Sequence, residues 1–431
     1  MPADTPSTSA AADRRIEADG TDANRSLRFS REQWFVALLL LMMTVMNYLD
    51  RQALSVVAPV MRKELGVSVM GYANAVNSFL LAYALMYAGS GIVLDRIGYR
   101  AGLAIFVGLW SVFSGLHATI SGYVSLLIFR FLLGLTEPAG FTGAVKTIAE
   151  RFSPSQRGLA TSALGIGTGL GSLIAPPLIV FLSLRFGWRS AFLIASSAAV
   201  VWLPLWLLAT RRAVADGKTQ IPTVRSKLRI PRDRRVLAYV LARFFGDSSG
   251  YFVLFWLPEY LVTAKHFSFV MLGKLGWIPP CGSDVGAIVG GYISSRLVVS
   301  GWQPLRSRKI LMTVAAVLLA IGAALQVASG VWAVLFSLCL CTIGVGMWAC
   351  NLHALAADAF PRSIVATVHG TAGSAGAVGG IIFNTLVGYF SSRHNYFAAL
   401  TMFALLLPLA VAPLWLWLNP VAPRDDQGEQ R

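Results

Sequence analysis

Charged side chains are scarce in this sequence. Only 13% of the 431 residues are Asp, Glu, Lys or Arg, while 56% are hydrophobic and the mean hydropathy is +0.64. An average soluble domain carries about 25% charged residues. This shortage excludes an ordinary soluble fold, because the surface of such a fold must be largely polar. Lipid is the natural solvent for a chain of this composition.

Cysteine and histidine are also rare, with four and five residues respectively. The cysteines stand in apolar runs and lack the spacing of metal ligands, so we expect no metal site and no cofactor. An enzyme would need a clustered nucleophile or metal set, and none is visible, so we do not expect an enzyme. A sensor would need a large output domain, but the polar tails are only about 33 and 12 residues long.

Apolar runs of about 20 residues, long enough to cross a hydrocarbon core of about 30 Å as a helix, recur along the chain. They predict an all-α membrane protein with twelve transmembrane helices and no strands. The predicted spans are 34–60, 70–94, 101–120, 123–149, 158–184, 189–209, 236–263, 268–297, 309–328, 331–356, 364–390 and 395–419.

The basic residues are distributed unevenly between the predicted loops. With the N-terminus inside, 25 of the 36 Lys and Arg residues fall on the inner side and 7 on the outer side. Cytoplasmic loops carry such an excess, so both termini are predicted to be cytoplasmic and the chain to lie in the cell inner membrane. The net charge of +16 is therefore a sign of topology, and we expect no nucleic-acid partner.

One long polar segment divides the twelve spans into two groups of six. Residues 210–235 carry nine Lys or Arg residues and two prolines. We predict a disordered cytoplasmic tail (1–33), a six-helix bundle (34–209), a cytoplasmic linker (210–235), a second six-helix bundle (236–419) and a cytoplasmic tail (420–431). The two bundles are expected to be related by a pseudo-twofold axis along the membrane normal.

A short repeat supports this division. The second span ends in Gly91-Ile-Val-Leu-Asp95-Arg96, and the eighth ends in Gly291-Tyr-Ile-Ser-Ser295-Arg296. Glycine permits close helix approach, the acidic or hydroxyl group can cap a neighbouring helix, and arginine sits at the membrane interface. We predict that Gly91, Asp95, Arg96 and Arg100 form a cytoplasmic gating loop.

Four charged residues lie well inside predicted spans of the first half, apart from Lys146 near the end of the fourth span, which can snorkel to the interface. They are Asp50 and Arg51 in the first span, and Arg130 and Glu137 in the fourth. Each charge in mid-membrane costs at least about 2.5–3.5 kcal/mol on insertion, so each requires a reason. Arg130 and Glu137 are seven residues apart, which places both on one helix face that could line a central cavity.

These residue types suit an anion symporter. We predict that Arg51 binds a substrate carboxylate, because arginine stays charged and grips carboxylates bidentately. Asp50 and Glu137 are the candidate proton carriers, and Arg130 modulates or orients Glu137. The structural alternative is a set of ion pairs that only fastens the first span to the fourth.

Further polar residues could contact a substrate. Tyr48, Tyr83 and Asn384 can donate hydrogen bonds to sugar hydroxyls, although tyrosines in spans often serve packing alone. In the second half, Arg243 and Asp247 are four residues apart and could pair along one helix. Asp284 could line the cavity or cap a helix, and His353 is either a proton site or a local hydrogen-bonding group.

Several strings, taken together, resemble the major facilitator superfamily and, within it, the hexuronate transporters of the anion:cation symporter family. The resemblance spans residues 33–420. It implies alternating access, the roles given above for Arg51, Asp50, Glu137 and Arg130, and a place near the substrate for Tyr83. The strings are Gly91–Arg100, Asn47-Tyr48-Leu49-Asp50-Arg51-Gln52, Arg130-Phe-Leu-Leu-Gly134-Leu-Thr-Glu137-Pro138, Ala175-Pro176-Pro177, Ala242-Arg243-Phe244 with Asp247, and Phe255-Trp256-Leu257-Pro258.

The chain departs from these relatives on the fifth span. Where they read N-S-G-T-N, this sequence has Gly165-Ile-Gly167-Thr168-Gly169, and glycine cannot replace the hydrogen bonds of an Asn amide. The resulting prediction is a monomeric, proton-coupled importer of a hexuronate such as glucuronate or galacturonate. The alternatives are an importer of an aldonate or aromatic acid, or a drug/proton antiporter.

Overall fold

The computed structural model describes residues 29–153, 156–211, 233–327, 330–360 and 364–418. Within these ranges the regular structure is helical. The α-helices, in chain order, are α2 (Arg31–Leu65), α3 (Val69–Leu116), α4 (Tyr123–Thr136), α5 (Pro138–Arg151), α6 (Arg157–Phe186), α7 (Arg189–Ala209), α8 (Arg234–Phe255), α9 (Leu257–Thr263), α10 (Phe269–Leu275), α11 (Ile278–Val299), α12 (Pro304–Ala324), α13 (Val331–Ala359), α14 (Val365–Ser392) and α15 (Tyr396–Trp417).

Helix α3 contains two membrane crossings. Its 48 residues would extend about 72 Å as one straight helix, more than twice the thickness of a hydrocarbon core. The backbone leaves the helical region at Gly98, where φ is +76° and ψ is 160°, a conformation that favours glycine. A side-chain carbon placed on Gly102 would overlap Leu94, so the chain turns back sharply at this point.

Three other crossings are each divided into two helices at a proline. Pro138, Pro258 and Pro279 stand in the first turns of α5, α9 and α11. Proline has no N–H, so it interrupts the hydrogen-bond ladder of a continuing span. Joined in this way, the described helices account for the twelve predicted spans.

Ten of the described helical segments are long and apolar enough to cross a membrane. The crossings that contain α8 and α11 complete the set, and they carry Arg243, Asp247 and Asp284. The boundaries differ from the predicted ones by a few residues. Helix α2, for example, begins at Arg31 because Ser30 caps it, with Ser30 Oγ accepting a hydrogen bond from the Gln33 N–H at 3.1 Å.

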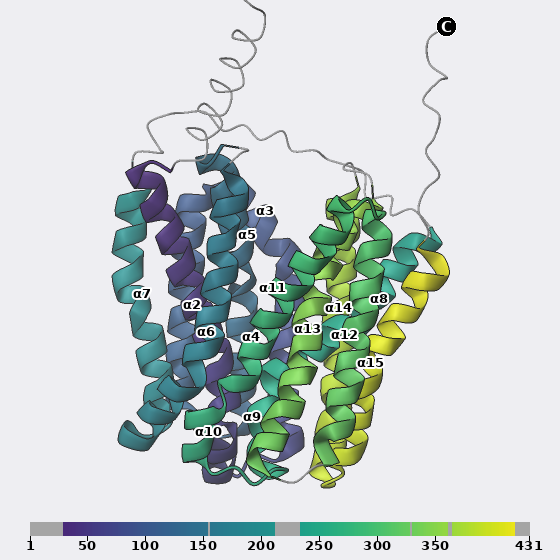
Figure 1. The fold of residues 1–431 in the computed structure, drawn as a ribbon. Helices are drawn as coiled ribbons and strands as arrows, with labels where there is room; N and C mark the ends of the chain where they lie inside the picture. The colour runs from purple at the N-terminus through teal and green to yellow at the C-terminus, as the bar shows by residue number, and fades with distance from the viewer. Residues whose placement is uncertain (1–28, 154–155, 212–232, 328–329, 361–363, 419–431) are drawn as a thin grey trace, which may run out of the picture.

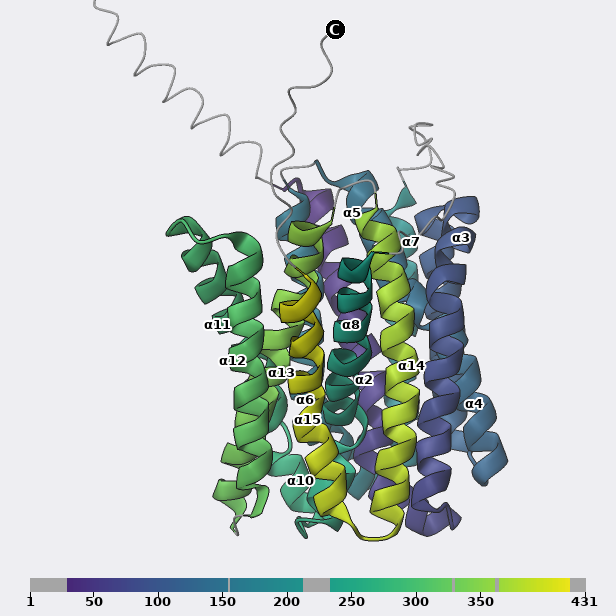
Figure 2. The ribbon, with the colours of Figure 1, turned by 90° about the vertical axis from the view of Figure 1, so that its right-hand side faces the viewer.

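The helices form two groups that lie side by side (Figure 1). We call α2–α7 the first half and α8–α15 the second half. Across the boundary, α14 packs beside α3, while α9 and α10 pack against α2 and α6 (Figure 2). We call the end of the molecule where α9 and α10 lie the α9 end. The predicted linker and tails fall almost wholly outside the described residues, so the domain boundaries stay a prediction.

Glycines allow helices to approach closely within each half. A side-chain carbon on Gly171 of α6 would lie 2.7 Å from Cβ of Tyr48 on α2. One on Gly379 of α14 would overlap the backbone of Phe244 on α8. The glycine-rich stretch of α6 thus lets this helix pack closely against α2, and that of α14 lets it pack closely against α8.

Candidate functional site

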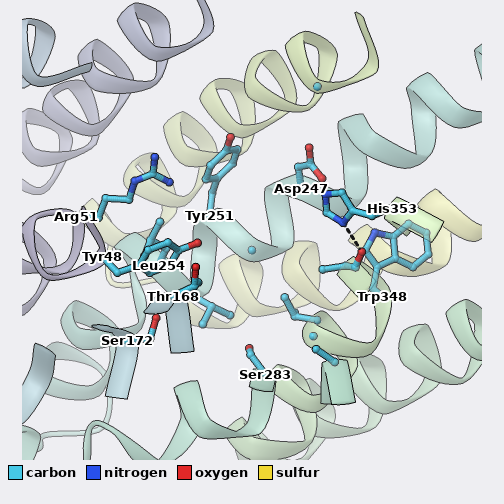
Figure 3. A pocket seen from close by; sticks show the side chains of 18 of the residues that line it. Tyr48, Arg51, Thr168, Ser172, Asp247, Tyr251, Leu254, Ser283, Trp348 and His353 are labelled. Carbon is cyan, nitrogen blue, oxygen red and sulfur yellow. Dashed lines mark hydrogen bonds between the residues drawn. The ribbon is translucent and has the colours of Figure 1, made fainter. Parts of the chain in front are cut away.

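A cavity of about 550 Å³ lies between the two halves. Helices α2, α3, α5 and α6 line it from the first half, and α8, α11, α13 and α14 line it from the second. Its wall mixes charged, hydroxyl and aromatic side chains (Figure 3). Ligand cavities commonly have this size, and a few polar groups on their walls fix the orientation of the ligand.

Arg51 presents its guanidinium group to this cavity from α2. The side chain is only 9% exposed, and its Nε donates a hydrogen bond to Oε1 of Glu137. The guanidinium carbon lies 4.8 Å from the ring centre of Tyr83 and 5.7 Å from that of Tyr48. Arg51, predicted to bind the substrate carboxylate, and Tyr48 and Tyr83, predicted to contact its hydroxyl groups, therefore form one cluster on the cavity wall.

Glu137 lies behind Arg51 rather than on the cavity surface. It is fully buried at the junction of α4 and α5, directly before Pro138. Among the ion pairs of the described residues, this one is buried on both sides, at 9% and 0% exposure. Removing either partner would leave an uncompensated buried charge, so the ionisation of Glu137 and the availability of Arg51 are coupled.

Asp50 and Arg130 lie deeper inside the first half. Oδ1 of Asp50 accepts a hydrogen bond from Ser114 Oγ at 2.6 Å, and both charged residues are at most 2% exposed. Arg130 is within electrostatic range of Asp50 and Glu137. The sequence predicted that the helix face carrying Arg130 and Glu137 could line the cavity. This prediction is wrong, because both side chains are buried inside the first half and neither lines the cavity.

The second half contributes another charged pair to the cavity. Nε of Arg243 donates to Oδ2 of Asp247 at 2.8 Å, as the spacing of four residues predicted. Nη1 of Arg243 lies 3.4 Å from Nε2 of His369, a residue that no pattern in the sequence singled out. Figure 3 shows Tyr251 between Arg51 on one wall and Asp247 on the other.

Asn384 does not line the cavity. Its side-chain nitrogen donates to the Ala73 carbonyl at 2.9 Å and to Asn77 Oδ1 at 2.7 Å, while its oxygen accepts from the Trp256 indole. The bonds to Ala73 and Asn77 join α14 to α3 across the boundary between the halves, and the bond to Trp256 lies within the second half. In this structure Asn384 is a contact between the halves, and its predicted place beside the substrate is not observed.

Other contacts between the halves gather at the same α9 end. Arg62 on α2 forms an ion pair with Glu259 on α9. The hydroxyl of Tyr72 donates to the Phe255 carbonyl at 2.5 Å. The cavity lining includes Tyr87 on α3 and His353 on α13, which lie toward the end opposite the α9 end.

The predicted gating loop is mostly helical. Gly91, Asp95 and Arg96 belong to the helical part of α3 before the break at Gly98, and Arg100 follows the break. Asp95 accepts a hydrogen bond from Lys146 Nζ of α5 at 2.5 Å, a pair that the sequence did not predict. Arg100 Nη2 donates to the Leu207 carbonyl of α7 at 3.3 Å.

The sequence matches the Major Facilitator Superfamily over residues 40–384. The chain belongs to this superfamily. It is thus a multi-pass membrane protein, and its fold class is confirmed as the helical fold of that family. The resemblance to hexuronate transporters is also supported by curated relatives.

Three of these relatives are named for the transport of sugar acids. The "Hexuronate transporter" of Escherichia coli (strain K12) is 27% identical over 403 residues, which cover 88% of this chain and 93% of that protein. The "Galacturonate transporter" of Dickeya chrysanthemi is 28% identical over 279 residues, covering 61% of this chain and 81% of that protein. The "Probable L-galactonate transporter" of Escherichia coli (strain K12) is 30% identical over 322 residues, covering 71% of this chain and 70% of that protein.

Two solved structures share the fold. A bacterial homologue of the human lysosomal transporter Spinster superimposes with a TM-score of 0.72 at 14% identity, covering 90% of this chain and 97% of that one. The D-xylose-proton symporter superimposes with a TM-score of 0.71 at 17% identity, covering 90% of this chain and 98% of that one. At these identities the likeness concerns the fold alone.

Proposed function

We propose that this protein imports a sugar acid such as galacturonate or glucuronate together with a proton. The observation that carries the proposal is the position of Arg51, which faces the cavity while holding a buried carboxylate, Glu137, behind it. An arginine that cannot lose its proton is suited to bind the substrate carboxylate. The superfamily relatives that are named for hexuronate, galacturonate and L-galactonate transport supply the substrate class.

Coupling follows from competition for one guanidinium group. When Glu137 is ionised, its charge neutralises Arg51, and a substrate carboxylate must compete with it. When Glu137 takes up a proton, Arg51 loses its partner and becomes a free cation in a site of low dielectric constant. Substrate carboxylate and proton therefore enter the site together, and each favours the binding of the other. Asp50, with Arg130 nearby, is the second candidate for the proton.

Transport requires that the cavity open to each side in turn. We propose that the α9 end faces outside, with both termini in the cytoplasm of a cell whose inner membrane holds the chain. The Arg62–Glu259 pair and the Asn384 bonds then close the outer side, and the cavity faces inward. Each half rocks as a unit about the substrate, and residues 210–235 are the linker that joins the two halves.

Uptake into proteoliposomes tests the proposal. With wild-type protein, galacturonate should accumulate when the outside is acidic, and Arg51→Gln should abolish this uptake. A second candidate, an importer of an aldonate, is favoured by the similarity to the relative named for L-galactonate. A panel of uronates, aldonates and aromatic acids, with and without a pH gradient, separates these substrates.

A further inference from the structure

Asp284 on α11 is a charged cavity residue without a partner. Arg51 pairs with Glu137, and Arg243 pairs with Asp247. Asp284 also lines the cavity and is half-buried, yet the described residues supply it with no hydrogen bond and no ion pair. A carboxylate in this position has two oxygens that can accept hydrogen bonds from a ligand.

The position of Asp284 depends on Gly169 of α6. A side-chain carbon on Gly169 would lie 2.9 Å from Oδ2 of Asp284 and 3.1 Å from its carboxyl carbon. A contact of 2.9 Å with a side-chain carbon essentially never occurs, so any larger residue at position 169 would displace the carboxylate. Gly169 therefore makes room for a polar group that comes from the other half of the molecule.

Asp284 and the Arg51 cluster lie at similar depth in the cavity. Gly169 faces Asp284, and Gly171 faces Tyr48. Two residues of a helix differ by about 3 Å along its axis. Tyr48 is also within electrostatic range of both Arg51 and Asp284. A small acid whose carboxylate rests on Arg51 would thus have its remaining atoms near Asp284.

Neighbouring hydroxyl groups of the wall are already engaged as donors. Thr168 Oγ1 donates to the Leu164 carbonyl at 2.9 Å, and Ser283 Oγ donates to the Thr342 carbonyl at 3.2 Å. Figure 3 shows Thr168 and Ser172 beside Tyr48, with Ser283 on the facing wall. These hydroxyl oxygens can still accept a hydrogen bond, but the charged carboxylate of Asp284 is a stronger acceptor than they are.

We infer that Asp284 is a specificity-determining residue that accepts hydrogen bonds from the hydroxyl groups of the substrate and repels a second carboxylate. The inference rests on the proposed function, because it assumes that Arg51 holds the first carboxylate. It narrows the substrate class to polyhydroxy acids with a single carboxylate. Diacids such as galactarate and acids without hydroxyl groups are disfavoured, the former by charge and the latter because Asp284 stays unpaired.

The test compares three probes in proteoliposome uptake and competition: galacturonate, galactarate and cyclohexanecarboxylate. Asp284→Ala should raise the KM for galacturonate by about 10- to 100-fold, the value of one or two hydrogen bonds to a charged group. The same variant should lower the inhibition constant of galactarate and leave that of cyclohexanecarboxylate unchanged or lower. Opposite shifts for two probes cannot arise from misfolding.

A transplanted side chain provides the matched control. Gly169→Asn combined with Asp284→Ala puts an amide where the carboxylate was, and should bring the KM for galacturonate back to within about tenfold of the wild-type value. Gly169→Asn alone displaces the carboxylate but keeps its negative charge, so the inhibition constant of galactarate should fall less than in Asp284→Ala.

Three results would overturn the inference. Asp284→Ala could weaken all three probes equally, which would make Asp284 a structural residue. Asp284→Asn could abolish accumulation with an unchanged KM, which would make it a proton carrier. An amino acid such as glutamate could outcompete galacturonate only when Asp284 is present, which would indicate recognition of an ammonium group. Failure of the proposed function is distinct, because Arg51→Gln would then leave the binding of all three acids unaffected.

Discussion

Replacement of Glu137 by glutamine imitates the protonated carboxyl group and removes its charge permanently. Glu137 is fully buried and Arg51 is 9% exposed, so water cannot replace the lost partner of Arg51. The amide oxygen of glutamine can still accept one hydrogen bond from Arg51. The variant should therefore fold, with Arg51 held in place but no longer neutralised.

The size of the effect follows from the interaction that is removed. A hydrogen bond between charged groups contributes about 1.5–3 kcal/mol, and its neutral counterpart about 0.5–1.5 kcal/mol. The difference of about 1–1.5 kcal/mol is what a substrate carboxylate no longer has to overcome. At neutral pH, galacturonate should bind Glu137→Gln about 5- to 10-fold more tightly than the wild type.

Two assays follow from this reasoning. Calorimetry of the purified variant should show an affinity that no longer rises as the pH falls, because the group that competes for Arg51 has no proton to gain. In proteoliposomes, exchange of internal for external galacturonate should persist, while accumulation driven by a pH gradient should disappear. If Glu137→Gln still accumulates substrate against a gradient, Asp50 or another group carries the proton and the reasoning fails.

Three further predictions concern other parts of the molecule. Arg51→Lys keeps the charge but loses the bidentate geometry, so galacturonate affinity should fall at least tenfold, and an unchanged isotherm would remove Arg51 from the binding site. Asp95→Asn breaks the bond to Lys146 and should slow uptake with the order of preferred substrates unchanged, whereas an altered order in competition assays would contradict a gating role. Arg62→Gln unpairs Glu259 at the α9 end and should increase labelling of a cysteine introduced there by an external thiol reagent, and equal labelling would show that the pair does not close this end.

The sequence predicted the membrane crossings well because spanning segments obey a strict rule. Backbone groups in lipid must be satisfied internally, which forces long apolar helices that are visible as runs of hydrophobic residues. Interruptions within a crossing were less visible. The helix breaks before Pro138 and Pro258 do not shorten the apolar run, so the sequence predicted one helix where the structure has two.

Candidate site residues could be predicted because a charged side chain inside a membrane span is energetically costly and so requires a role. Which of these residues pair with one another could not be predicted. Arg51 and Glu137 are 86 residues apart, and their contact depends on how α2 is rotated against α4 and α5. Helix packing sets this rotation, and hydropathy carries no information about it. The same reason explains why Arg130 and Glu137 turn into the bundle rather than toward the cavity.

Contacts between the halves could not be predicted for a similar reason. Asn384 looked suitable for a sugar hydroxyl, yet here its side chain bonds to Ala73 and Asn77 across the boundary and to Trp256 within the second half. Such contacts depend on how the two halves pack against each other, and hydropathy carries no information about that packing. The pairing of Lys146 with Asp95 was not predicted, because a lysine near a helix end can reach the membrane interface with its side chain and needs no acidic partner there.

The central claim is that sugar acid and proton cross together. Purified protein in proteoliposomes, with galacturonate inside and outside at equal concentration, allows a direct measurement. An imposed pH gradient, acidic outside, should drive galacturonate inward above its equilibrium level, with a simultaneous inward proton movement that a pH-sensitive dye records. Galacturonate that stays at equilibrium under this gradient, or that accumulates only under a sodium gradient, would contradict the account.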